Sequence, residues 1–148
     1  MRIGHRRRRE MFGGRQTEAD LVICMVRDLN TLVPDCFAWR METRGIPKWT
    51  KTGWKVDRNA MERGKADIAG VVRPMDNYGD VYGAGLSFVI EAKMPGEYLK
   101  PHQREWLTDY VTRGGGRAAV CHTSSEAMEF VGSVRRQVQK WPGEILAE

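Results

Sequence analysis

Long hydrophobic runs and abundant cysteine are both missing from this chain of 148 residues. No apolar segment approaches the roughly 20 residues that a membrane-spanning helix needs, and none follows the charged N-terminus as in a signal peptide. The three cysteines, Cys24, Cys36 and Cys121, lie far apart among apolar neighbours. That spacing predicts buried thiols and disfavours a disulfide framework or a zinc site. We therefore expect a cytoplasmic protein with no membrane partner.

The length is too small for two ordinary domains but sufficient for one buried core. Hydrophobic residues make up 41% of the chain and charged residues 29%, as in globular proteins. A block of like charges followed by a glycine pair opens the sequence and is typical of a flexible segment. We expect a flexible basic arm over residues 1–14 and a single domain over residues 15–148.

Basic residues are concentrated in two segments. Residues 1–10 contain five arginines and one glutamate, and residues 40–65 contain eight lysines and arginines against three acidic residues. Because the net charge of the whole chain is only +5, the remainder is acidic. This distribution is typical of a protein that holds a polyanion, nucleic acid above all, against its own carboxylates. A solubilising tail with a solvated loop is the alternative that charge alone leaves open.

Hydrophobic periodicity predicts a helix, three strands, a helix, a strand and a last helix. Thr17 and Thr123 are each followed three residues later by an acid, which predicts a capping box at two helix starts, and Pro101 suits the first turn of the helix between them. Residues 43–64 show no steady period and predict a long loop or a loose hairpin. The strands are expected at residues 36–41, 66–72, 86–93 and 117–122. Helices around a small mixed sheet make this an α/β fold.

Three charged residues are expected on one side of this sheet. Residues two apart in a strand share a face, so Glu91 and Lys93 point the same way, opposite to Phe88 and Ile90. An antiparallel hairpin between the second and third strands brings Asp67 beside Glu91. Two close carboxylates repel each other unless one is protonated or a cation lies between them, and oxygen ligands suit Mg²⁺ or Mn²⁺. The sequence therefore predicts a divalent-metal site.

Glu18 supports this site from the first helix. It lies four, seven and eleven residues before the apolar Val22, Met25 and Leu29, on the same helical face, so its carboxylate points toward the core. A carboxylate on a buried face needs a partner. A merely stabilising position in the first helical turn is the alternative. Beside Asp67 and Glu91, the functional interpretation is favoured.

Several segments together carry a family resemblance. They are Glu18, Trp39-Arg40 with Gly45, Gly64-Lys65-Ala66-Asp67, Glu91-Ala92-Lys93, Leu99-Lys100-Pro101-His102-Gln103 and the stretch from Gly114 to Val120. In this order they resemble the PD-(D/E)xK nuclease superfamily, and within it the small stand-alone VRR-NUC enzymes of phages and bacteria. The resemblance extends over residues 17–138. It implies a restriction-endonuclease-like core with a small central mixed sheet flanked by helices, in αβββαβ order.

The resemblance also implies roles for individual residues. Asp67, Glu91 and the Ala92 carbonyl would hold the metal ion, and Glu18 would bind through water or a second ion. Lys93 would orient the attacking water or help to deprotonate it, and Gln103 would help to position it. This chemistry is metal-assisted hydrolysis of phosphodiester bonds, that of a metal-dependent endodeoxyribonuclease.

The chain departs from the family pattern at two positions. Ala66 replaces a proline, which only stiffens the strand entry. Lys100 stands where the family often has a helix-capping hydroxyl, so the cap is expected to be weaker while the chemistry is unaffected. His102 beside it is expected to be a surface residue, and His122 a structural one.

The basic segments are expected to contact DNA. The expected contacts are Arg6, Arg7, Arg8, Arg9, Arg40, Arg44 and Lys65. Trp49 and Trp54, which lie among lysines, suit stacking on unpaired bases; alternatively they pin down a long loop or form a dimer contact. The resemblance implies a branched or structured substrate such as a Holliday junction or a flap, and a homodimer. The alternative function is a non-catalytic nucleic-acid-binding module that retains the fold, although the intact acid, acid and lysine set speaks against it.

Overall fold

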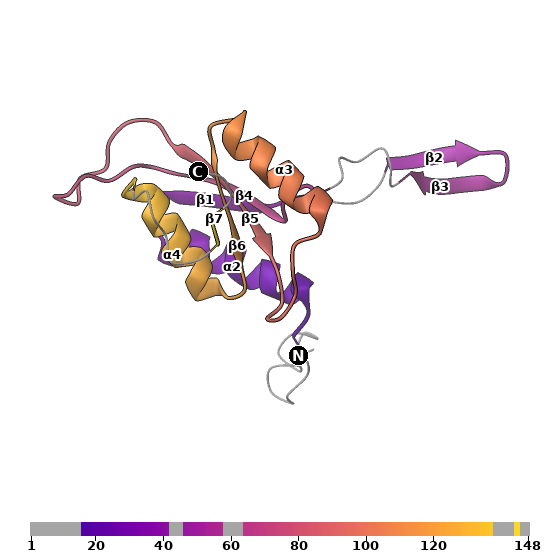
Figure 1. The fold of residues 1–148 in the computed structure, drawn as a ribbon, viewed down its shortest axis with the longest axis horizontal. Helices are drawn as coiled ribbons and strands as arrows, with labels where there is room; N and C mark the ends of the chain where they lie inside the picture. Colours follow the sequence, from indigo (N-terminus) through magenta and orange to yellow (C-terminus); the bar gives the residue numbers. More distant parts are fainter. Residues whose placement is uncertain (1–15, 42–45, 58–63, 138–143, 146–148) are drawn as a thin grey trace, which may run out of the picture.

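The computed structural model describes residues 16–41, 46–57, 64–137 and 144–145. The basic arm expected over residues 1–14, with Arg6 to Arg9, lies outside this range, as does Arg44. The elements are α2 (Glu18–Leu32), β1 (Cys36–Arg40), β2 (Ile46–Thr50), β3 (Gly53–Asp57), β4 (Ile68–Val72), β5 (Leu86–Ala92), α3 (Pro101–Thr112), β6 (Arg117–Cys121), α4 (Ser124–Arg135) and β7 (Glu144–Ile145). The predicted mixed α/β architecture is confirmed (Figure 1).

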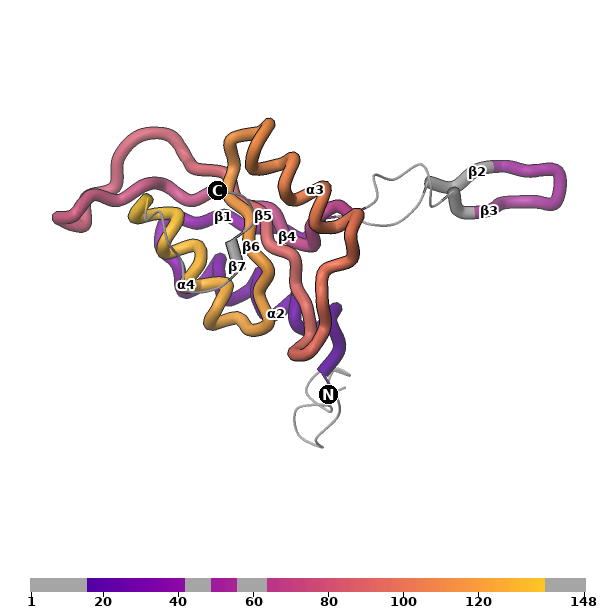
Figure 2. Tube along the Cα trace, in the orientation of Figure 1, coloured from indigo at the N-terminus to yellow at the C-terminus, as the bar shows by residue number. Residues whose placement is uncertain are grey.

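The main sheet has five strands in the order β1-β4-β5-β6-β7. Its pairs are antiparallel except for the parallel pair of β5 and β6. In the β4–β5 pair Ile68 lies opposite Ile90 and Val72 opposite Leu86, which confirms the predicted hairpin. Figure 2 shows the connection between these strands, residues 73–85, as a long excursion at one end of the sheet. The opposite end, where β4 begins and β5 ends, carries Asp67 and Glu91.

Helices cover both faces of the sheet (Figure 1). On one face, Phe88 and Ile90 of β5 pack with residues of α2 and α4 such as Met25 and Phe130. On the other face, Val89 packs with residues of α3, including the fully buried Leu107. Because Glu91 shares the parity of Val89, it lies on the α3 side of the sheet.

The helix caps follow the sequence expectation at α2 and only half of it at α4. At α2 the Thr17 hydroxyl accepts from the Asp20 N–H, and the Asp20 carboxylate accepts from the Thr17 N–H at 3.0 Å. At α4 the Thr123 hydroxyl accepts from the Glu126 N–H at 3.1 Å. The Glu126 carboxylate, however, accepts from the His122 N–H at 2.6 Å, one residue earlier than a capping box requires. It therefore stabilises the connection from β6 to α4.

A second, two-stranded sheet consists of β2 and β3 alone. The strands are antiparallel, with Trp49 opposite Trp54 and Thr50 opposite Gly53. Figure 1 shows this hairpin standing apart from the five-stranded sheet. Of the two forms that the sequence allowed for residues 43–64, a loop or a hairpin, the described residues adopt the hairpin.

The thiols are buried to different extents. Cys121 is fully buried in β6, whereas Cys24 and Cys36 are only partly buried, so the expectation of buried thiols is wrong for those two. Cys36 is partly exposed because it opens an edge strand. Burial nevertheless raises the pKa of its thiol to about 11. In the described part of the chain, every helix is too short or too polar to cross a membrane.

Candidate active site

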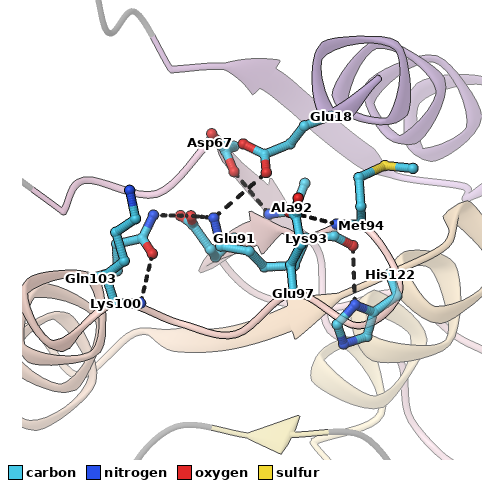
Figure 3. Close-up of polar contacts among 10 residues, drawn as sticks. All are labelled: Glu18, Asp67, Glu91, Ala92, Lys93, Met94, Glu97, Lys100, Gln103 and His122. Carbon is cyan, nitrogen blue, oxygen red and sulfur yellow. Dashed lines mark hydrogen bonds and ion pairs between the residues drawn. The ribbon is translucent and has the colours of Figure 1, made fainter. Parts of the chain in front are cut away.

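The residues that the sequence assigns to catalysis and metal binding lie together at one end of the sheet (Figure 3). Each comes from the end of an element: Glu18 opens α2, Asp67 directly precedes β4, Ala92 closes β5 with Glu91 before it and Lys93 after it, and Gln103 lies in the first turn of α3. The predicted strand over 66–72 begins slightly late, at Ile68. Asp67 still extends the sheet, because its carbonyl accepts from the Met41 N–H at 2.8 Å.

Glu91 is the centre of this cluster. Its side chain is buried, with 1% of the residue exposed. The Oε1 atom accepts from the Lys93 ammonium at 3.0 Å and from the Gln103 amide nitrogen at 2.5 Å. The Oε2 atom is buried and has no hydrogen-bond partner among the described residues. Because an unsatisfied buried oxygen is costly, this atom is available to a ligand.

Gln103 links the start of α3 to Glu91. Its Oε1 atom accepts from the Lys100 backbone N–H at 3.0 Å, which leaves its amide nitrogen to donate to Glu91. The two contacts fix which way the amide points. The Lys100 side chain itself forms no capping hydrogen bond with the described residues, in agreement with the expected weak cap. The glutamine therefore caps the start of α3 and at the same time holds the Glu91 carboxylate.

Asp67 and Lys93 are fixed by backbone contacts. The Asp67 carboxylate accepts from the Ala92 N–H at 2.9 Å. The Lys93 N–H donates to the Cys121 carbonyl at 3.1 Å, and the Lys93 carbonyl lies 3.0 Å from Nδ1 of His122. His122 thus has the structural role that the sequence indicated. These contacts aim the Lys93 ammonium at Glu91 on one side and at Glu18, 3.6 Å away, on the other.

The carboxylates of the site resist ionisation. Burial, and then the charge of Asp67, raises the pKa of Glu91 to about 7. Burial likewise raises the pKa of Asp67 and of Glu18. For Lys93, burial favours a lower pKa, but its hydrogen bond to Glu91 and the surrounding carboxylates outweigh burial and raise the pKa. Lys93 is therefore a cation at neutral pH, and its single positive charge faces the carboxyl groups of Glu18, Asp67 and Glu91.

The donor chemistry of the cluster fits a hard divalent ion. All the candidate metal ligands are oxygens, Glu91 has an unsatisfied oxygen, and burial raises the pKa of Glu18, Asp67 and Glu91. Within the described residues, however, no three His, Cys, Asp or Glu side chains are arranged as a ready metal site. An ion at Asp67 and Glu91 would have to complete its shell with carbonyl or water oxygens.

Glu97 is a fourth carboxylate that the sequence reasoning missed. It lies in the connection between β5 and α3, and its Oε2 accepts from the Met94 N–H at 3.2 Å. After burial and Asp67, Glu97 also contributes to the raised pKa of Glu18. Figure 3 shows it beside the other acids. Its only signal in the sequence is its place between Glu91 and Gln103, since a glutamate in a turn is ordinary.

Two of the residues assigned to DNA can be placed. Arg40 is exposed at the end of β1, and its charge is among those that lower the pKa of Asp67. Lys65 is half-buried just before Asp67. Both therefore lie at the site end of the sheet. His102 is exposed on α3, as expected.

Comparison with family models adds independent information. Residues 15–125, most of the chain, match the VRR-NUC domain. No match was found among curated proteins or among solved structures. The matched region includes every residue of the cluster from Glu18 to Gln103. The chain carries a nuclease-type domain, which implies nucleic acid binding, and it belongs to the VRR-NUC family.

Proposed function

We propose that the protein is a divalent-metal-dependent DNA endonuclease with a restriction-endonuclease-like, PD-(D/E)xK core. The observation that carries this proposal is the buried Glu91 carboxylate, held between Lys93 and Gln103 with one oxygen unsatisfied by the described residues and with Asp67 beside it. The order of the elements around it, α2-β1-β4-β5-α3-β6 with one inserted hairpin, supports the core.

The chain's residues divide the work. Asp67 and Glu91, with the Ala92 carbonyl, would hold Mg²⁺ or Mn²⁺, and Glu18 would take part through water or a second ion. Such an ion stabilises charge on the phosphate oxygens and lowers the pKa of a bound water. Lys93 has a raised pKa, so it orients water and neutralises phosphate charge as an ammonium, and it is poorly suited to accept a proton. Gln103 holds Glu91 in place.

Branched or structured DNA, such as a four-way junction or a flap, is the proposed substrate. The support is the family resemblance together with the basic Arg40 and Lys65 at the site end of the sheet. In this proposal residues 15–148 form the nuclease domain and the arm of residues 1–14 contacts DNA. Symmetric cleavage of a junction needs two active sites, which favours a homodimer.

Cleavage of synthetic DNA tests the function. Four-way junctions, flaps, linear duplex and single strands are incubated with Mg²⁺ or Mn²⁺ and wild type, Asp67→Asn or Lys93→Ala. Wild type should cut branched DNA, and each variant should be slower by about 100-fold or more, the usual effect of removing a group that stabilises the transition state. Glu105→Gln, an exposed acid on α3, is the matched control and should leave the rate unchanged. If wild type binds these DNAs and cuts none with either metal, the non-catalytic binding module is the correct function.

A further inference from the structure

The hairpin of β2 and β3 carries two tryptophans that are not part of the candidate active site. Trp49 and Trp54 lie opposite each other with ring centroids 5.5 Å apart in an edge-to-face arrangement. They remain 66% and 71% exposed. A single exposed aromatic ring is ordinary, but two adjacent rings form an apolar patch whose burial by a ligand is favourable. The rings contact each other across the hairpin, yet most of their surface stays open to a ligand.

Side-chain hydrogen bonds close the turn at the tip of the hairpin. The Thr50 hydroxyl donates to the Gly53 carbonyl at 2.8 Å and accepts from the Thr52 N–H at 3.4 Å. Gly53 has a φ of 112°, a conformation that glycine adopts without strain. These contacts close the turn next to the paired tryptophans. The rings are therefore presented on an ordered support, which lowers the entropic cost of binding.

The hairpin is anchored at the site end of the sheet. It is inserted between Arg40, the last residue of β1, and Asp67. The returning chain passes the start of α3 at Gly64, where a Cβ atom would lie 2.2 Å from the His102 carbonyl oxygen. Met41, which precedes the hairpin segment, donates to the Asp67 carbonyl, so the described residues on both sides of that segment lie at the site end of the sheet. A ligand on the hairpin would thus be continuous with one at the catalytic residues.

The charge of the hairpin favours nucleic acid over a second copy of the chain. Residues 46–57 contain three lysines and one aspartate, and the side chains of Lys51 and Lys55 are exposed. This charge attracts phosphates and repels an identical hairpin. Every base has a flat aromatic face, and an unpaired base can turn that face onto a protein ring, whereas a base inside a duplex is already stacked on its neighbours.

We propose that the hairpin binds unpaired nucleotides, which stack on Trp49 and Trp54 while Lys51 and Lys55 contact the backbone. It directs the protein to DNA in which single-stranded bases adjoin a duplex, such as a flap or an opened branch point. The identity of the polyanion as DNA rests on the proposed function. The hairpin's selectivity for unpaired bases is a separate claim, carried by the exposed ring pair.

Binding experiments without cleavage test the hairpin. Fluorescence anisotropy in EDTA compares a duplex bearing a single-stranded flap with a blunt duplex, using wild type and the double variant Trp49→Ala/Trp54→Ala. The double variant should lose about tenfold or more in affinity for the flap, as expected for lost base stacking, and less than twofold for the blunt duplex. The variant Trp49→Tyr/Trp54→Tyr retains two rings and should keep most of the flap affinity.

Tyr78→Ala is the matched control. Tyr78 is 92% exposed in the connection of residues 73–85, at the opposite end of the sheet, and its removal should change neither affinity. Unchanged flap affinity in the double alanine variant overturns the proposal. So does conversion of a dimer to a monomer in sedimentation velocity with unchanged affinity per protomer, which would identify a dimer contact. Loss of flap affinity in a protein that cuts no DNA would support the hairpin while refuting the nuclease.

Discussion

At the scale of single residues, the surroundings of Glu91 disfavour the ionised form of its carboxyl group. Burial and Asp67 disfavour its ionised carboxylate, whereas the hydrogen bond and charge of Lys93 offset only part of that cost. As a result its pKa rises from 4.5 to about 7. Such a side chain stabilises the fold when it is protonated, and a bound cation would remove the repulsion when it is ionised.

The stability of the metal-free protein should therefore depend on pH in an unusual direction. The unfolded chain ionises Glu91 near pH 4.5 and the folded chain near pH 7. The stabilising contribution is complete below pH 4.5 and is lost as the pH rises through 7, because the unfolded state releases its proton first. Thermal denaturation in EDTA at pH 5 and pH 8 should show wild type losing stability relative to Glu91→Gln. A difference between the two proteins that is the same at both pH values would contradict this explanation.

The sequence predicts some of these residue positions and not others. The pleat of a strand places Glu91 and Lys93 on one side, and the structure has them there, in contact. Glu97 was missed because residues in a turn follow no period. The direction of the Gln103 amide could not be predicted either, since it depends on a hydrogen bond from the Lys100 backbone.

At the scale of elements, the site consists of the ends of helices and strands, and Gly64, which precedes β4, packs against the first turn of α3. Gly64 has a φ of 79° and lies against the His102 carbonyl and the Cα atom of Gln103. A side chain there would push the first turn of α3 away from β4 and β5. Because Gln103 lies in that turn, the contact sets the position of its hydrogen bond to Glu91.

Gly64→Ala should therefore impair activity as well as stability. The added Cβ lies 2.2 Å from His102, so α3 must shift, and cleavage should fall about tenfold or more for a misplacement of this kind. Gly79→Ala is the matched control, since Gly79 has a φ of 87° but no described atom lies within 4 Å of an added Cβ. The control should lose about 1 kcal/mol of unfolding free energy from backbone strain alone and keep its activity. Urea denaturation and cleavage rates measure both; equal cleavage by the two variants would contradict the proposed contact.

Element prediction succeeded where a pattern is long enough to read. In α2 both the predicted apolar stripe and the predicted capping box are present. The stripe could be predicted because apolar residues recur at intervals of three and four along the whole helix. For residues 43–64 the sequence predicts either a loop or a hairpin, since Pro47 and Gly53 interrupt any strand pattern. The two-residue strand β7 is too short to show alternation at all.

At the scale of the whole molecule, one end of the sheet gathers the acids and the neighbouring basic residues. The start of α2, the start of β4, the end of β5 and the start of α3 meet there, with helices on both faces (Figure 1). The other end carries the connection of residues 73–85. The carboxylates, the Lys93 ammonium and the basic residues Arg40 and Lys65 therefore lie at the same end of the sheet, where their charges can act together on a phosphate group.

We propose above all that Asp67 and Glu91 hold a divalent ion. Isothermal titration calorimetry of Mn²⁺ into wild type and Asp67→Asn tests it most directly, because it does not depend on the choice of DNA. Wild type should bind Mn²⁺, and the variant, which keeps its shape but loses a ligand charge, should bind at least about tenfold more weakly. Equal Mn²⁺ binding by both proteins, or no binding by wild type, would contradict it.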